Sequence, residues 1–227
     1  MLATITALLL LSPVADKGYV MRLKLHEGEV IKYDLLIERD KPKQSGVFSS
    51  SYTIAKIHAG TIDMDCRAIG LKIDGKNRTG DLNKAWGGQV AKLPWTELSH
   101  RTGMAIGYNA SKANGDIIPY LYEAGIYFPY FKRDAVKPGD TWIGSTTATG
   151  GCTDGTFTLK QVKTEHGKQL AYFDVTDIKF LDPSNAQLGP MRMVVDLSNG
   201  LPTVVDYKVK NSSTGRTSHF RQTLVKS

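Results

Sequence analysis

The amino-acid sequence predicts a mostly β protein built on an antiparallel curved sheet, either an open half-barrel or a closed barrel of long strands. Apolar and polar residues alternate along several segments, and glycine-containing turn sequences separate these segments. Strands that follow one another through tight turns pair in antiparallel fashion, which produces a meander, a barrel or a curved sheet. Of the 227 residues, 41% are apolar, as in an ordinary globular protein with a core.

The period of two is clearest in four segments. Successive side chains of a strand point to opposite faces, so this alternation predicts strands with one buried face. The apolar members should face the core, and the polar members between them should face solvent. The apolar positions are Met21, Leu23 and Leu25; Phe157 and Leu159; Phe173 and Val175; and Val205, Tyr207 and Val209.

Turn sequences occupy residues 27–29, 74–77, 165–168 and 198–200. The pair Asn199-Gly200 gives the clearest hairpin prediction, because both residue types readily adopt the positive φ angles of a type I′ turn. We therefore expect residues 190–197 to pair with residues 203–210. Pro202 lacks an amide proton and fits only the start or edge of a strand. In the expected register Val205, Tyr207 and Val209 face the core, and Asp206, Lys208 and Lys210 face solvent.

The middle of the chain departs from the alternating pattern. Residues 81–103 hold two tryptophans, a glycine pair and a proline, which predicts a long irregular connection with a short helix. Residues 119–131 hold six aromatic side chains and two prolines, and a second short helix is expected to begin at Pro119.

Four residues of this aromatic connection are candidate ligand-binding residues: Tyr120, Tyr122, Tyr127 and Phe128. They would form the lid or mouth of an apolar pocket, with the tyrosine hydroxyls at its wet edge. The alternative is a plug of aromatic side chains that closes one end of the sheet, because aromatic residues are mostly used in burial.

The N-terminus has the pattern of a secretory signal peptide. Residues 2–11 form an uninterrupted run of apolar and small residues, too short to span a bilayer as a helix. Small residues follow, and the charged Asp16 and Lys17 come next, which places the cleavage site near Ala15. The expected organisation is a signal peptide at residues 1–15 and one β-rich domain at residues 16–227. The protein is then exported, to the periplasm, the cell surface or the medium.

An exported protein can form disulfides, and the chain has two cysteines, Cys66 and Cys152. Cys66 falls on the apolar face of an alternating segment, and Cys152 follows a glycine pair in an expected loop. A single bridge between them is one interpretation, and two free thiols are the other.

The net charge of +7 predisposes the protein to anionic surfaces, such as lipid headgroups or cell-wall polymers. Arg22 and Lys24 share one face of an alternating segment near the start of the chain, and Lys208 and Lys210 share a face near its end. If the terminal strands are neighbours, these four residues would form one basic stripe that binds anions.

No catalytic constellation stands out. The loop at residues 150–155 superficially resembles the Gly-Cys nucleophile loop of exported cysteine transpeptidases, but Asp154 would raise the pKa of the Cys152 thiol rather than lower it. Asp63 and Asp65 share one face of an expected strand, which could begin a cation site but more commonly marks a solvated face. We therefore expect no cofactor and no bound metal.

Two segments resemble an uncharacterised family of exported bacterial β-rich proteins. The first is Phe128-Pro129 together with residues 136–142, Val-Lys-Pro-Gly-Asp-Thr-Trp, and the second is residues 191–202, a strand–Gly–strand ending. The resemblance covers residues 100–227 and implies an exported β fold without an assigned activity. The general architecture is also similar to that of lipoprotein-carrier half-barrels, in which a curved sheet wraps an apolar groove.

These observations favour an exported, non-enzymatic binding or envelope-associated protein that holds an apolar or amphipathic ligand in a groove of the sheet. One alternative is a basic protein that binds an anionic envelope surface, and another is an enzyme of an unrecognised class. The expected partners are a lipid-like ligand or an anionic surface, and no specific recognition of nucleic acid is expected.

Overall fold

The computed structural model describes residues 18–58, 61–85, 89–94, 132, 134–148, 151–180 and 186–225. Nearly all of the regular structure is strand, as the alternating sequence predicts. The elements are β1 (Val30–Asp40), β2 (Lys43–His58), β3 (Thr61–Ile73), β4 (Lys76–Asn77), α1 (Thr79–Ala85), β5 (Gln89–Pro94), β6 (Thr141–Ala148), β7 (Gly151–Glu165), β8 (Lys168–Phe180), β9 (Ala186–Leu188), β10 (Met191–Asp196), β11 (Pro202–Asn211) and β12 (Thr217–Val225).

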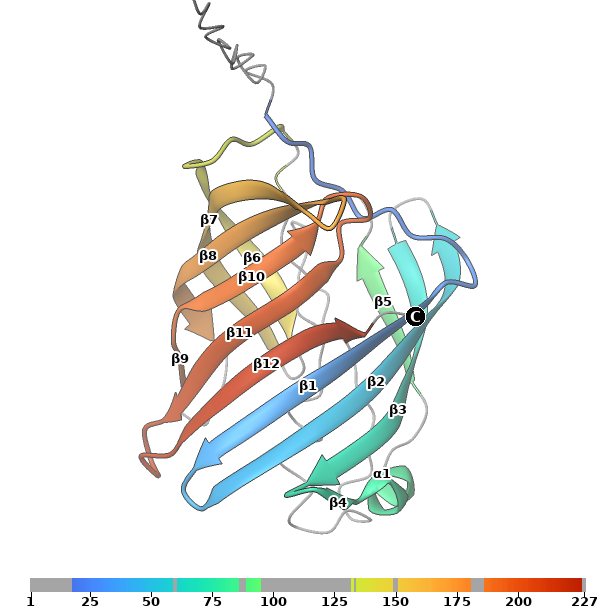
Figure 1. Cartoon of the computed structure of the whole chain (residues 1–227), viewed down its shortest axis with the longest axis vertical. Helices are drawn as coiled ribbons and strands as arrows, with labels where there is room; N and C mark the ends of the chain where they lie inside the picture. The colour runs from blue at the N-terminus through green and yellow to red at the C-terminus, as the bar shows by residue number, and fades with distance from the viewer. Residues whose placement is uncertain are drawn as a thin grey trace, which may run out of the picture.

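All the described strands belong to one antiparallel sheet, 12 strands within the described residues, which curves around its own inner face (Figure 1). The main path runs β4-β3-β2-β1-β12-β11-β10-β8-β7-β6, with β5 added beside β3 and β9 beside β11. Among the described strands no pairing joins the two ends of this path, so the sheet is open rather than a closed barrel. The predicted curved antiparallel sheet is confirmed.

The first and last of the described strands pair with each other and join two halves of the sheet. β1 pairs with β12 from Lys32, opposite Val225, to Arg39, opposite Ser218. The strands β1–β5 lie on one side of this seam, and the strands β6–β12 lie on the other (Figure 1). The Tyr33 hydroxyl also crosses the seam and donates a hydrogen bond of 3.0 Å to the carbonyl of Pro202.

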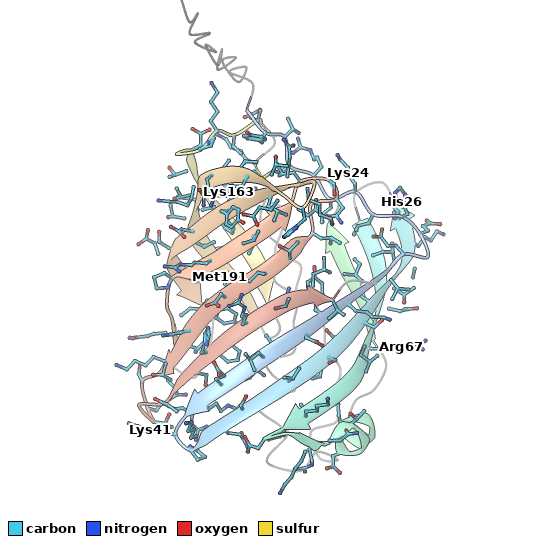
Figure 2. All side chains as sticks on the ribbon, in the orientation of Figure 1. Lys24, His26, Lys41, Arg67, Lys163 and Met191 are labelled. Atoms are coloured by element: carbon cyan, nitrogen blue, oxygen red, sulfur yellow. The ribbon has the colours of Figure 1, made fainter. Side chains whose placement is uncertain are left out.

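One hydrophobic core covers the inner face. The apolar positions that the alternation assigned to the core in β7, β8 and β11 are buried, except Val209, which is half-buried and packs against the core. Burying each such side chain stabilises the fold by about 1.5–3 kcal/mol, so the strand faces follow directly from the period of two. Met191, which Figure 2 labels on β10, is fully buried in the same core.

The segment at residues 18–28, called the N-terminal segment below, differs from its prediction. Met21, Leu23 and Leu25 are buried and the residues between them are exposed, as expected. The segment nevertheless joins no ladder: it crosses the end of the sheet and makes isolated contacts (Figure 1). Tyr19 bridges to Val136, and the Lys24 amide donates a hydrogen bond of 2.8 Å to the Asn199 carbonyl. An extended chain alternates its side chains whether or not it has a neighbour to pair with, so alternation alone did not reveal the difference.

The turns confirm the predicted positions but not the predicted type. The turn after β10 is not type I′, because Gly200 has φ +76° and Asn199 is not among the described residues with positive φ. Its loop is longer, with Gly200 N bonded to Asp196 O at 2.7 Å and Asp196 N bonded to Leu201 O at 3.0 Å. Consecutive positive φ angles instead occur at Asp74-Gly75 and at His166-Gly167, in two-residue connections that suit the right-handed twist of a hairpin.

The expected hairpin of β10 and β11 is present, but its ladder covers only residues 192–195 and 202–206, and the far end of β11 pairs with β9 instead. Arg192 lies opposite Asp206 and Met193 lies opposite Val205, with a bulge between Val194 and Val195 near the turn. Lys208 is exposed and Tyr207 is buried, as the alternation requires.

The first mid-chain interruption is only partly irregular. The expected short helix is present as α1, in which Leu82 is fully buried. The strand β5 was not expected there, and it pairs with β3 along the register from Thr61, opposite Pro94, to Cys66, opposite Gln89. The helix expected at Pro119 lies outside the described residues.

Candidate functional site

Three groups of aromatic side chains line the inner face of the sheet. Tyr33 and Tyr52 meet edge to face, with ring centroids 6.3 Å apart. Tyr207 stacks on Phe220 from the neighbouring strand at 4.9 Å. Aromatic pairs in these geometries add about 0.5–1.5 kcal/mol to the energy of burial. The first pair lies on one side of the β1–β12 seam and the second on the other, so aromatic side chains line both halves of the sheet.

The third group lies on β6, β7 and β8. The Trp142 ring stacks on Phe157 at a centroid distance of 5.9 Å, and it meets the edge of Phe173 at the same distance. The next residue along β6, Ile143, points the other way and is 81% exposed. The inner face is therefore apolar up to the edge strand of the sheet.

Polar groups interrupt this apolar face near the seam. The buried Tyr33 hydroxyl is bonded to Pro202, and burial raises the pKa of Tyr33 well above its usual value, with a further contribution from Tyr52. Ser50, Ser218 and Gln222 are also buried. The inner face therefore combines apolar side chains with a few buried polar groups near the seam.

The predicted ligand-binding residues Tyr120, Tyr122, Tyr127 and Phe128 lie outside the described residues, and their role stays a prediction. The disulfide also stays a prediction. Cys66 lies in β3 opposite Tyr52, and Cys152 lies in β7 opposite Thr147, but their side chains are outside the described part of the structure.

The predicted anion-binding residues do not form one stripe. Lys24 bonds to the turn before β11, and one guanidinium nitrogen of Arg22 donates to the carbonyls of Met21 and Lys132. Lys208 and Lys210 lie near the other end of β11. At a rise of about 3.3 Å per residue, the length of β11 separates the two pairs by roughly 20–25 Å.

Opposite charges alternate across the outer face of the sheet. Arg221, Asp206, Arg192 and Asp174 occupy directly opposed positions on β12, β11, β10 and β8. Asp206 lies 3.7 Å from Arg221, and Asp174 lies 3.8 Å from Lys160. Opposed charges of this kind are typical of a solvated sheet face, and they compensate one another locally.

His219 is the centre of a small charged cluster beside this row. Its Nδ1 lies 3.0 Å from a Glu38 carboxylate oxygen on β1, and its Nε2 lies 3.0 Å from an Asp206 oxygen on β11. Partial burial lowers the pKa of His219, but the hydrogen bonds to Asp206 and Glu38 outweigh this effect and hold the pKa above its usual value. Protonated His219 therefore links three strands at the seam.

The three residues are visible in the sequence, but no local pattern indicates that they lie close together. Their partnership depends on the pairing of β1 with β12 and of β12 with β11, across more than 150 residues of chain for Glu38 and Asp206. The only local signal was that Glu38, Asp206 and His219 each lie on the polar face of an alternating segment.

Within the described ranges, no group of three or more His, Cys, Asp or Glu residues is placed to hold a metal ion. Asp63 and Asp65 are both in β3, where they lie opposite Lys56 and Thr53 of β2. In the part of the chain that the structure covers, no helix is long and apolar enough to cross a bilayer.

Comparisons with known proteins give no family. No family model matches the chain, and no curated protein matches it. Among solved structures, a DUF1329 family protein from Desulfovibrio piger aligns over 86% of this chain and 82% of its own, with 10% identity and a TM-score of 0.20. At that TM-score the alignment does not establish a common fold.

Proposed function

We propose that this protein is an exported binding protein that holds an apolar or amphipathic ligand against the inner face of its sheet. The observation that carries the proposal is the inner face itself: one open sheet with a continuous aromatic and aliphatic lining and buried polar groups near the seam. Aromatic and aliphatic side chains with a few buried polar groups among them are the usual lining of a site for such a ligand. The signal-peptide pattern at residues 1–15 supports export to the cell envelope.

Native mass spectrometry of the protein purified from the cells that produce it tests the proposal directly. We expect a bound lipid-like molecule that is released under denaturing conditions. Recovery of ligand-free protein, with no affinity for lipids or detergents, would contradict the proposal.

The position of the ligand can be tested with a fatty acid that carries a nitroxide quencher. Trp142 lies on the inner face, so its fluorescence should be quenched on binding, and Trp142→Phe should remove that part of the signal. The matched control is Ile143→Trp in the Trp142→Phe background, because residue 143 is the exposed neighbour on the opposite face. Equal quenching at the two positions would place the ligand elsewhere.

A further inference from the structure

Three turns lie side by side at one end of the sheet, at the lower edge of Figure 1. They connect β1 to β2, β3 to β4 and β11 to β12. The Thr217 amide donates a hydrogen bond of 2.9 Å to the Asp40 carboxylate, and this bond ties the third turn to the first. The Ser45 amide, near the start of β2, donates a hydrogen bond of 2.9 Å to the Asp74 carboxylate. This bond ties the second turn to the strand that follows the first turn.

Basic side chains collect at these turns and at the strand ends beside them. The group has six members, of which five are exposed and one, Arg216, is half-buried. None of the six forms an ion pair with another described residue. The group, called the basic end, consists of Lys41, Lys43, Lys72, Lys76, Lys210 and Arg216.

The acidic residues at the basic end do not neutralise it. Asp40 and Asp74 are the two carboxylates among the three turns, and each accepts a hydrogen bond from a backbone amide. The next carboxylate along β1, Glu38, is bonded to His219. The Nε atom of Arg216 is buried and has no hydrogen-bond partner within the described structure. Six basic groups against two carboxylates leave a local excess of positive charge.

We propose that the basic end docks the protein on an anionic lipid surface. The cations lie at the tips and ends of adjacent strands, from β11 across β12, β1, β2 and β3 to β4. With neighbouring strands about 4.8 Å apart, the array spans roughly 24 Å. Hairpin tips side by side can reach a flat array of anionic headgroups together, and each contact with a lipid headgroup adds electrostatic attraction. The surface is separate from the inner face, and docking does not require that the inner face hold a ligand.

The test measures binding of the full protein to vesicles of phosphatidylcholine with phosphatidylglycerol and to vesicles of phosphatidylcholine alone. We expect binding to the anionic vesicles only, and weaker binding as the salt concentration rises. Lys41→Gln with Lys43→Gln should lower the partition coefficient roughly tenfold or more. The matched control is Lys160→Gln with Lys163→Gln, which removes the same charge from β7; Figure 2 labels Lys163 near the end of the sheet opposite Lys41.

The comparison of the two double variants decides the result. If both lose binding equally, net charge rather than the basic end is responsible, and the proposal is overturned. If the protein binds neither kind of vesicle but binds a soluble polyanion such as heparin through Lys41 and Lys43, the assignment to lipid is overturned. A circular dichroism spectrum and melting curve like those of the parent chain establish that each variant is folded, since both pairs are exposed.

Discussion

Two hairpin turns at the same end of the sheet each contain a glycine with positive φ, but the contacts around the two glycines differ. In the β7–β8 turn, His166 and Gly167 have φ angles of 50° and 77°, and nothing lies within 4 Å of the position that a Gly167 Cβ would occupy. In the β10–β11 turn, a Cβ on Gly200 would overlap the backbone carbonyl of Arg22 in the N-terminal segment. The first turn is determined locally, and the second is part of a tertiary contact.

The Asp196 carboxylate, which lies beside the second turn, also takes part in both local and tertiary contacts. Asp196 is fully buried, accepts hydrogen bonds from the amide and hydroxyl of Ser198, and lies 2.6 Å from the Lys168 ammonium at the start of β8. Lys168, which directly follows the β7–β8 turn, thus supplies a hydrogen-bond partner for the carboxylate beside the β10–β11 turn. A turn sequence predicts where the chain reverses, but the stability of the turn depends on what packs against it.

The largest effect is expected in the strand that follows the tightly packed turn. Tyr207→Asp should destabilise the protein by at least about 4 kcal/mol, because it removes a buried stacked ring and places a carboxylate in the core. Lys208→Asp, at the exposed neighbouring position, should cost under about 1 kcal/mol. Chemical denaturation measures both changes, and equal losses would mean that the register of β11 in solution differs from the one described.

The next largest loss of stability is expected from substitutions of glycine in the turns themselves. Gly200→Ala should cost about 3 kcal/mol, since the methyl group meets the Arg22 backbone and the φ angle disfavours any L-residue. Gly167→Ala has the same φ penalty without the steric contact and should cost about 1 kcal/mol. Thermal and urea unfolding of the two variants provide the comparison. A Gly200 variant no less stable than the Gly167 variant would show that the N-terminal segment does not pack on this turn.

Asp196→Asn should cost about 2–3 kcal/mol at neutral pH, because a buried charge-assisted hydrogen bond is lost. Burial alone raises the pKa of Asp196, but the hydrogen bonds from Lys168 and Ser198 outweigh it and lower the pKa. A lowered pKa stabilises the fold above the unfolded-state value of about 4 and stops doing so as the pH falls through the folded-state value.

The wild type should therefore lose stability in this acid range, and Asp196→Asn should lose less. Denaturation curves between neutral and acidic pH measure the difference. Asp174→Asn is the matched control, because its contact with Lys160 is 3.8 Å long and exposed.

The smallest effect is expected at the half-buried His219 and its two carboxylate partners. Its raised pKa stabilises the fold below the unfolded-state value of about 6.5, and this contribution disappears as the pH rises through the folded-state value. His219→Gln should cost about 1 kcal/mol at mildly acidic pH, after allowance for solvent screening, and less at alkaline pH. Melting temperatures across this range measure the effect. If the variant retained the full pH dependence of the wild type, another group would be responsible.

Much of the sheet could be predicted from local sequence. The alternation around Leu159, Phe173 and Tyr207 identified three strands and the buried side of each, because one-residue spacing decides which face a side chain takes. The same rule overpredicted at Met21 and Leu23, where an extended chain buries alternate residues without joining a ladder. The type of the Asn199-Gly200 turn was also wrong, since its contact with Arg22 has no signature in the turn sequence.

The candidate sites were less predictable than the strands. Arg22 and Lys24 were grouped with Lys208 and Lys210 on the assumption that the terminal segments pair along their length, whereas the N-terminal segment crosses the sheet end. The basic end was missed because Lys41, Lys72 and Arg216 belong to different hairpins and come together only when their strands are ordered.

The sequence by itself determined those features of this protein that depend on near neighbours: several of the strands, the buried face of each, and the positions of the main reversals. Only the tertiary structure decided that the first strand pairs with the last, which joins Glu38 to His219 and places the turn of Arg216 beside that of Asp40. The physical reason is that alternation and turn chemistry act over a few residues. The choice of a distant partner strand depends instead on how well whole faces pack and on the entropy of closing a long loop.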